Sequence, residues 1–411
     1  MQKKNISSLP SKLKEALIYC NQNNFERAKS IYLDILKDFP GQPDALTNLG
    51  TIELQQGNIL EGVGLIKKSI EINPFQAQAL NNLGNGFMEL NENDHALEYF
   101  SRAIKINPNL MDAYYNKGRV LAFLGRHEES IHEYEQAIKI NLKHFPSFNN
   151  RGLSLHRLKK NKEALQSYNQ AIQLKPDYAE ALNNSGIILN ELKDFDKGLD
   201  SYNKAIKINP FFAEAFNNKG ILLRNIRLFD QAIEAFNQAL SIRSDYIDAL
   251  FNLSLIYLLR KDFTRGWPLF EKRFELHESK KFLKNKPLFT NFAVENKKVL
   301  IVFDQGIGDQ ILFSILLKEL DQNRNKFIAK LDYRLIQIFE RSFPGIEFIS
   351  NDQPISDFDF YLPIENLGKL FRQNIKSFTQ KKIGYLKPKN DTLKIKIADR
   401  LIIRNKLDAR K

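Results

Sequence analysis

Two groups of residues in this chain have the types and the spacing that binding or catalysis requires. The first is a row of asparagines, each two residues before a small residue that recurs every 34 positions. A carboxamide has two N–H donors and one acceptor oxygen, so a row of them can bind a peptide backbone without reading its side chains. The row consists of Asn48, Asn82, Asn116, Asn150, Asn184, Asn218 and Asn252. The alternative is compositional, because asparagine is abundant throughout the chain.

The second group is the segment Asp304-Gln305-Gly306-Ile307-Gly308-Asp309, which follows a short apolar run. Glycines let a ligand approach the backbone closely, and the start of a helix attracts anions through its free N–H groups. The dinucleotide fingerprint needs a third glycine in register, and its absence excludes NAD and FAD. On the residues alone, Asp309 is either a catalytic carboxylate or a helix cap.

The 34-residue period predicts a stack of paired helices that positions the asparagine row. A small residue lies twelve positions after each marker, and a bulky one lies sixteen after it, as two closely packed antiparallel helices require. Prolines on the same period are expected to end one helix pair and start the next. The markers are Gly50, Gly84, Gly118, Gly152, Gly186, Gly220 and Ser254.

These positions resemble the tetratricopeptide repeat, over about seven to eight copies in residues 9–275 with a degenerate last copy. The resemblance implies a right-handed α-solenoid that binds a protein or an extended peptide in its groove. It places the asparagines on the concave face, like the asparagine ladder of protein O-GlcNAc transferases. Beside the row lie Lys117, Arg151 and Lys219, which either attract acidic partners or pair with local carboxylates.

The last third of the chain predicts a small parallel α/β sheet, because short apolar runs alternate with helical spacing. We expect the Gly306–Asp309 turn where a strand end meets a helix start, the usual place for ligands. The expected strands are Lys298–Phe303, Phe327–Leu331, Ile346–Ile349 and Phe358–Leu362, with helices at Gln310–Leu320 and Tyr333–Phe343.

The segments GWPLFEKRF, DQGIGDQILFS, YLPIENLGKLF and IGYLKP, in this order, resemble bacterial tetratricopeptide proteins with a heptosyltransferase-like domain of the GT-B type. The resemblance implies a Rossmann-like acceptor half, with Asp309 as general base and with Asp304, Gln305, Gly306 and Gly308 binding the substrate. Asp304 replaces the glutamate of that family, and Gln310 replaces its threonine.

A GT-B enzyme also needs a second α/β half for a nucleotide-sugar donor, and the roughly 25 residues that follow are too few for a domain. We therefore expect a mostly α protein with a half GT-B lobe. Its expected parts are an extension at 1–8, the solenoid at 9–275, a basic linker at 276–295, the α/β half at 296–390 and a basic tail at 391–411.

Two functions follow. One is a peptide-binding scaffold associated with glycosylation; the other is a glycosyltransferase acting on a protein or cell-surface glycan, with its donor half missing or supplied in trans. Enzyme activity stays open, and no cofactor is expected apart from that donor sugar.

Composition narrows the remaining classes. The formal charge is +13, but no nucleic-acid module accompanies it, so nucleic acid is not an expected partner, although the basic tail leaves RNA or a membrane surface open. The single cysteine, Cys20, is expected to be buried on a helix, and the six histidines lack metal-ligand spacing. Without a secretory signal or a membrane span, we expect a soluble cytoplasmic protein.

Overall fold

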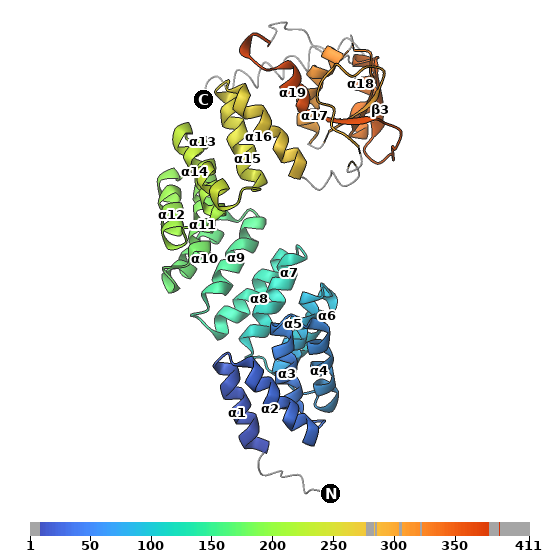
Figure 1. Ribbon diagram of the computed structural model, residues 1–411. Helices are drawn as coiled ribbons and strands as arrows, with labels where there is room; N and C mark the ends of the chain where they lie inside the picture. The colour runs from blue at the N-terminus through green and yellow to red at the C-terminus, as the bar shows by residue number, and fades with distance from the viewer. Residues whose placement is uncertain are drawn as a thin grey trace. The chain divides into compact units, whose positions relative to one another are not determined.

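The computed structural model describes residues 9–276, 283, 286–303, 306–320, 323–377 and 386. Within these residues, sixteen consecutive helices precede a small parallel sheet, as Figure 1 shows, so the predicted fold class is confirmed. The chain forms two compact units, Met1–Pro210 and Phe211–Lys411. Asp304, Gln305, part of the expected basic linker and the basic tail lie outside the described residues.

The first unit consists of six antiparallel helix pairs. First helices have 13 residues and second helices have 14, and turns of three and four residues complete the 34-residue period. The helices are α1 Leu9–Asn21, α2 Phe25–Asp38, α3 Pro43–Gln55, α4 Ile59–Ile72, α5 Ala77–Glu89, α6 Asn93–Ile106, α7 Met111–Phe123, α8 His127–Ile140, α9 Phe145–Arg157, α10 Asn161–Leu174, α11 Ala179–Glu191 and α12 Phe195–Ile208.

The second unit begins with two further pairs, α13 Ala213–Asn225 with α14 Phe229–Ile242 and α15 Ile247–Leu259 with α16 Phe263–Leu276. In five of the pairs an aromatic ring of the second helix packs against the marker glycine of the first, whereas Gly50 meets Ile66 instead. A Cβ on Gly152 would lie 2.6 Å from the ring of Tyr168, which is 1% exposed. The predicted packing of large residues against small ones is therefore confirmed.

The turns between helices correct one expectation and add one feature. The periodic prolines, such as Pro74, lie inside the four-residue turn rather than in the first turn of the next helix, which begins at Ala77. The three-residue turn places one residue per repeat at positive φ, a common end of a helix. Glycine occupies this position at Gly57 and Gly125, Asn23 and Asn91 tolerate it, and Lys159, Lys193, Arg227 and Lys261 adopt it at a cost.

The sheet of the second unit has four parallel strands in the order β3-β2-β1-β4. The strands are β1 Lys298–Val302, β2 Lys326–Leu331, β3 Ile346–Ser350 and β4 Phe360–Pro363. Each expected long helix is divided into an α-helical and a 3-10 segment. These are α17 Ile307–Phe313 with η3 Ser314–Leu320, and η4 Tyr333–Leu335 with α18 Ile336–Ser342; α19 Asn366–Phe371 and η5 Ile375–Ser377 follow β4.

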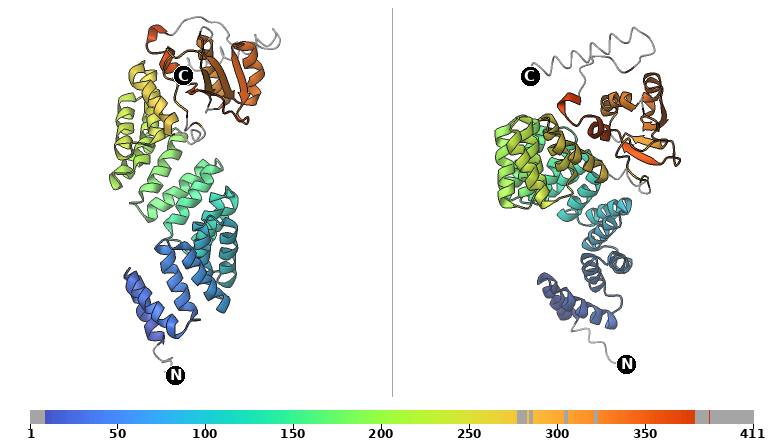
Figure 2. Two further views of the ribbon diagram at one scale, coloured as in Figure 1. Left: turned by 45° about the vertical axis from the view of Figure 1, so that its right-hand side comes forward. Right: turned by 45° about the horizontal axis from the view of Figure 1, so that its top comes forward.

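The described helices η3, α18 and α19 pack on one face of the sheet, and Figure 2 shows the strands side by side with helices against them. Their core includes Leu317, Phe339 and Leu367. The opposite face carries a smaller cluster in which loop residues Ile355 and Phe358 cover the strands. The chain crosses from the edge strand β3 to β4 in this loop, so the described lobe has helices on a single face.

Candidate functional site

The asparagine row lies on the first helices of successive pairs, from α3 to α15. These helices contact one another directly within each unit, for example α5 with α7 and α7 with α9. They therefore form a continuous surface along each stack, and the row runs across it. Asn116 and Asn252 are buried, at 7% exposure, whereas the other five asparagines are partly exposed.

The carboxamides of the row also connect the repeats. Three of them donate their Nδ2 hydrogen to an asparagine one repeat earlier, and that acceptor is itself buried. The pairs are Asn116–Asn81 at 3.2 Å, Asn184–Asn149 at 3.1 Å and Asn252–Asn217 at 3.4 Å. In two further repeats, Asn82 donates to Thr51 Oγ1 at 2.9 Å and Asn150 donates to the Tyr115 hydroxyl at 3.2 Å.

Sequence reasoning missed the buried acceptors, although the doublet Asn-Asn at 81–82, 149–150, 183–184 and 217–218 was a visible signal. Their position follows from helix geometry, because residues one apart on a helix are separated by about 100° and one of the two must turn inward. A buried carboxamide is stable only when it is hydrogen-bonded, and the next repeat supplies that bond.

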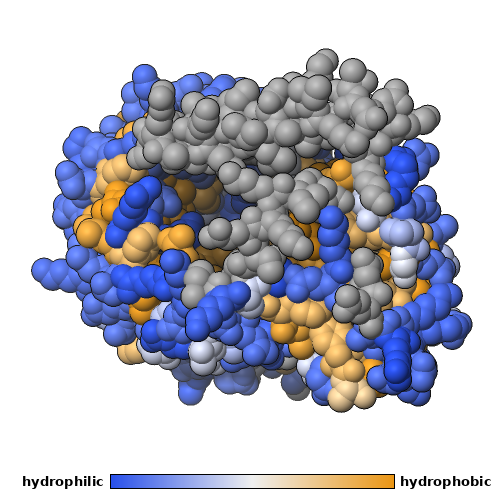
Figure 3. Space-filling view, turned by 90° about the horizontal axis from the view of Figure 1, so that it is seen from above, coloured by the Kyte–Doolittle hydropathy of each residue, from blue (hydrophilic) through white to orange (hydrophobic). Residues whose placement is uncertain are grey.

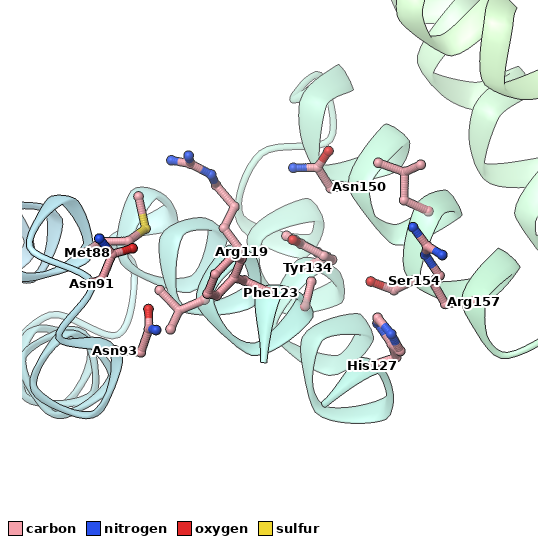
Figure 4. A pocket seen from close by; sticks show the side chains of 13 residues that line it. Met88, Asn91, Asn93, Arg119, Phe123, His127, Tyr134, Asn150, Ser154 and Arg157 are labelled. Atoms are coloured by element: carbon pink, nitrogen blue, oxygen red, sulfur yellow. The ribbon is translucent and has the colours of Figure 1, made fainter. Parts of the chain in front are cut away.

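A pocket of about 440 Å³ opens between the first helices α7 and α9, close to the turn between α5 and α6 (Figure 4). The row contributes Asn150 to it, and Tyr134 of α8 also lines it. Two arginines and two apolar side chains form much of its rim: Arg119 and Phe123 from α7, and Leu153 and Arg157 from α9. Phe123 is 75% exposed and Leu153 is 41% exposed, so both apolar groups are available for contact.

The arginines of the pocket have no carboxylate in an ion pair within the part of the chain that the structure describes. The Arg119 guanidinium lies 5.9 Å from the ring centroid of Tyr115 on its own helix. Burial raises the pKa of Tyr115, while Arg119 and the hydrogen bond from Asn150 act in the opposite direction. The site is therefore cationic, with a neutral phenol and a carboxamide beside it.

The cations next to the row are placed differently. Lys117 Nζ lies 2.9 Å from Glu133 Oε1. Arg151 donates from Nε to Ser167 Oγ at 3.1 Å and lies 3.9 Å from Glu135, and burial lowers the pKa of its guanidinium. Local pairing, one of the two alternatives from the sequence, is therefore confirmed for both residues. Lys219 is half-buried.

The second candidate site lies at the carboxyl ends of β1 and β4. From β1 the chain continues on one side to β2, and β4 pairs on the other side, so the strand order reverses here. Open parallel sheets bind ligands at such a point. Gly306 and Gly308 have open space where a Cβ would be, and the Asp309 side chain is exposed.

The Gly306–Asp309 turn differs from one expectation. Gly306 is the residue that precedes the first helical position of α17, so Asp309 lies in the first turn and is not the cap. No hydrogen bond to the Asp309 carboxylate is present in the described residues, so nothing there orients it. Its neighbour Gln310 is buried and accepts from the backbone N–H of Asp332 at 3.1 Å, which fixes α17 to the end of β2.

The segment GWPLFEKRF belongs to α16 and contacts the sheet lobe. Trp267 Nε1 donates to the carbonyl of Arg372 at 2.8 Å, and its ring packs against Gly368 of α19. Glu271 accepts from Asn366 Nδ2 at 2.8 Å and pairs with Lys369 at 2.5 Å. From the sequence this segment was only the end of the last repeat and a marker of resemblance; in the structure it joins the repeats to the lobe.

Other classes of site find little support in the described residues. No group of three or more His, Cys, Asp or Glu side chains there could hold a metal ion. No described helix has the length and apolar character for crossing a bilayer, and the face in Figure 3 is mainly hydrophilic with separate hydrophobic patches. Cys20 is partly exposed, so its expected burial is wrong; its Sγ lies 3.9 Å from the Tyr32 hydroxyl.

Repeated helix pairs of constant length define an α-solenoid. The chain is a tetratricopeptide repeat protein, and proteins of this family typically bind proteins or peptides. Models described as tetratricopeptide repeat or TPR repeat match residues 13–77, 77–110, 112–144, 152–193, 179–212 and 201–234. All of these matches lie within the helical repeats.

Solved structures of other repeat proteins resemble parts of the chain. YrrB, described as a TPR protein with an unusual peptide-binding site, is 26% identical over 45% of this chain and 95% of its own, with a TM-score of 0.39. MamA is 21% identical over 39% and 95%, with a TM-score of 0.37. PilF of Pseudomonas aeruginosa is 20% identical over 50% and 94%, with a TM-score of 0.46. None of the curated proteins matches the sequence.

Proposed function

We propose that this protein is a scaffold that binds an extended segment of a partner protein along its first helices, through the asparagine row. The observation that carries the proposal is that partly exposed carboxamides of the row are already held in place by hydrogen bonds. Asn150 and Asn184 are held by bonds to the preceding repeat, yet each retains exposed surface. A group whose rotamer is already fixed loses less entropy when it binds a ligand, so the row is preorganised.

The spacing of the row suits a polypeptide. Neighbouring helices pack about 8–10 Å apart. An extended chain rises about 3.3 Å per residue, so one carboxamide would meet about every third peptide unit. The bond to the preceding repeat uses one N–H of Asn184. The side chain has a second N–H as well as an acceptor oxygen, which are the groups that a peptide unit requires.

The proposal is tested by selecting peptides from a random twelve-residue display library with the purified chain. The double variant Asn150→Ala/Asn184→Ala removes two partly exposed carboxamides. The matched control, Asn169→Ala/Asn203→Ala, removes two exposed asparagines from the second helices α10 and α12. Net hydrogen bonds contribute about 0.5–1.5 kcal/mol each, so the first variant should bind selected peptides about 5- to 150-fold more weakly. Equal affinity of both variants would remove the row from the mechanism.

A second function is favoured by the position of the Gly306–Asp309 turn. The turn lies where the strand order of the sheet reverses, and the resemblance assigns Asp309 there as the base that takes a proton from an acceptor hydroxyl. We propose as the alternative that the lobe is the acceptor half of a glycosyltransferase for a protein or glycan. Substrate contacts of Asp304, Gln305, Gly306 and Gly308 belong to this alternative.

Calorimetric titration of the chain with UDP-N-acetylglucosamine and with an ADP-heptose distinguishes the two functions. Binding of either sugar nucleotide would favour the glycosyltransferase, whereas peptide binding without it would favour the scaffold. If turnover appears with an added partner, Asp309→Asn should abolish it while the helical content stays constant. A fully active Asp309→Asn variant would end the assignment of the base.

A further inference from the structure

We propose that the pocket between α7 and α9 anchors a partner segment that carries an acidic side chain about three residues from an apolar one. The inference rests on the proposed peptide-binding function and specifies its partner. It concerns side-chain recognition, which the asparagine row cannot supply, because carboxamides match any peptide unit. The groups involved are the guanidinium groups of Arg119 and Arg157 and the side chains of Phe123 and Leu153.

The four side chains alternate in type across the two helices. Arg119 and Phe123 are four residues apart on α7, and Leu153 and Arg157 occupy the same two positions one repeat later on α9. Because α7 and α9 contact each other, the cation of one helix lies beside the apolar group of the other in both rows. A segment that crosses from α7 to α9 therefore meets one cation and one apolar group, whichever row it follows and in whichever direction it runs.

The distance between the helices sets the spacing in the partner. Packed helices lie about 8–10 Å apart. A polyproline-II-like segment rises about 3.1 Å per residue with three residues per turn, so its residues i and i+3 share one side at about 9 Å. The acidic and the apolar side chain of the partner are thus expected three residues apart. The same segment can place one peptide unit per repeat at the asparagine row.

Charge selects the acidic group. Lys117 and Arg151 lie near carboxylates of their own chain, whereas Arg119 and Arg157 form no ion pair with a carboxylate within the described residues. A planar guanidinium binds a carboxylate through two parallel hydrogen bonds. Phe123 and Leu153 would lose water contact in the same step. The combination favours a peptide carboxylate with an apolar neighbour over a nucleic acid, which requires a broader basic surface.

The test uses the full chain and the same random twelve-residue display library. The variant Arg119→Glu/Arg157→Glu reverses the charge of the pocket. The control Lys68→Glu/Lys162→Glu makes the same change in net charge at exposed positions of the second helices α4 and α10. The wild type and the control should both enrich peptides with Asp or Glu three residues from Phe, Leu or Ile. The pocket variant should bind those peptides at least tenfold more weakly and enrich Lys- or Arg-containing peptides instead.

The outcomes separate the inference from the function on which it rests. Enrichment of peptides without acidic residues, or of the same peptides by the pocket variant, overturns the inference and leaves the scaffold intact if Asn150→Ala/Asn184→Ala still loses binding. Enrichment of no peptide by the wild type overturns both. Far-ultraviolet circular dichroism verifies the folding of all variants; the charge-reversal variants change only exposed side chains.

Discussion

Replacing Gly368 by alanine should loosen the contact between the last repeat helix and the sheet lobe. A Cβ at this position would lie 2.7 Å from Cζ3 of Trp267 and closer still to Cη2. Carbon atoms pack favourably at about 3.5–4.0 Å, so the indole would have to move by about 1 Å. A displacement of that size also lengthens the 2.8 Å hydrogen bond from Trp267 Nε1 to the carbonyl of Arg372.

The expected size of this effect follows from three terms. Overpacking costs about 1–3 kcal/mol, and the weakened hydrogen bond costs up to about 1 kcal/mol. Alanine gains about 0.5–1 kcal/mol over glycine within a helix. The net loss is about 2 kcal/mol, which lowers the thermal midpoint of a unit of this size by about 4–8 °C.

Tryptophan fluorescence measures this contact directly, because Trp267 is the single tryptophan of the chain. Gly368→Ala should shift the emission of the native state to longer wavelength and lower the midpoint of the fluorescence melt. Gly308→Ala is the control in the same lobe, because a Cβ there meets no atom within 4 Å. Identical emission and midpoint for Gly368→Ala and the wild type would refute the packing argument.

Three further predictions concern the repeats, each followed by urea unfolding at 222 nm. Gly152→Ala should destabilise the fold by about 1 kcal/mol, because the cost of overpacking exceeds the gain in helix propensity. Gly64→Ala, with free space around it, should stabilise the fold by about 0.5–1 kcal/mol. A change of stability in the same direction for both variants would contradict this. Lys193→Gly should stabilise by about 0.5 kcal/mol, because φ is +63° there, and a lower midpoint would speak against strain. Burial raises the pKa of Glu53, but the hydrogen bonds from Lys29 and Asn58 lower it by more, so the pKa in the folded state is below its usual range. The ionised Glu53 side chain therefore stabilises the fold at neutral pH, and this stabilisation is lost as the pH falls through the lowered pKa. Lys29→Met should cost about 2 kcal/mol at pH 7 and less in acid, once Glu53 is protonated; a loss independent of pH would argue against the pair.

The repeats could be predicted from the sequence because each positional requirement recurs. One glycine such as Gly152 is ambiguous, but six at the same spacing define the helix pair. The same period contained two signals that composition obscured. The buried acceptor Asn149 precedes a row member and resembles it in type, and Lys193 at positive φ carries no mark of its conformation. Both depend on which way a side chain or a peptide turns, which is fixed by packing between repeats.

The lobe was predictable to a different extent. Short apolar runs located the strands within two residues, since buried parallel strands are apolar on both faces. The division of each expected helix and the loop that covers the second face left no periodic signal. The roles of Asp304 and Gln305 remain predictions, because both lie outside the described residues. The sequence did not single out the pocket cations Arg119 and Arg157. They matter because no carboxylate pairs with them in the described residues, and pairing depends on tertiary structure.

The joint at α16 bears on the candidate sugar site as well as on stability. The backbone N–H of Ile364, just after β4, donates to the carbonyl of Val302 at the end of β1, and the chain then enters α19 at Asn366. Glu271 of the repeat helix binds Asn366 directly. The segment from the end of β4 to α19, which borders the place where the strand order reverses, is therefore held by the repeat helix α16.

The two contacts of Glu271 differ in how much they contribute to stability. Lys369 is 47% exposed, and ion pairs of this kind contribute about 0–1 kcal/mol. The bond to Asn366 is the stronger constraint, because Asn366 is 5% exposed and a buried carboxamide without a partner costs about 1–3 kcal/mol. Ring packing and this buried bond together hold α19, so the end of β4 should move with α16. The last repeat therefore sets the position of the end of β4, the strand that pairs with β1 just before the Gly306–Asp309 turn.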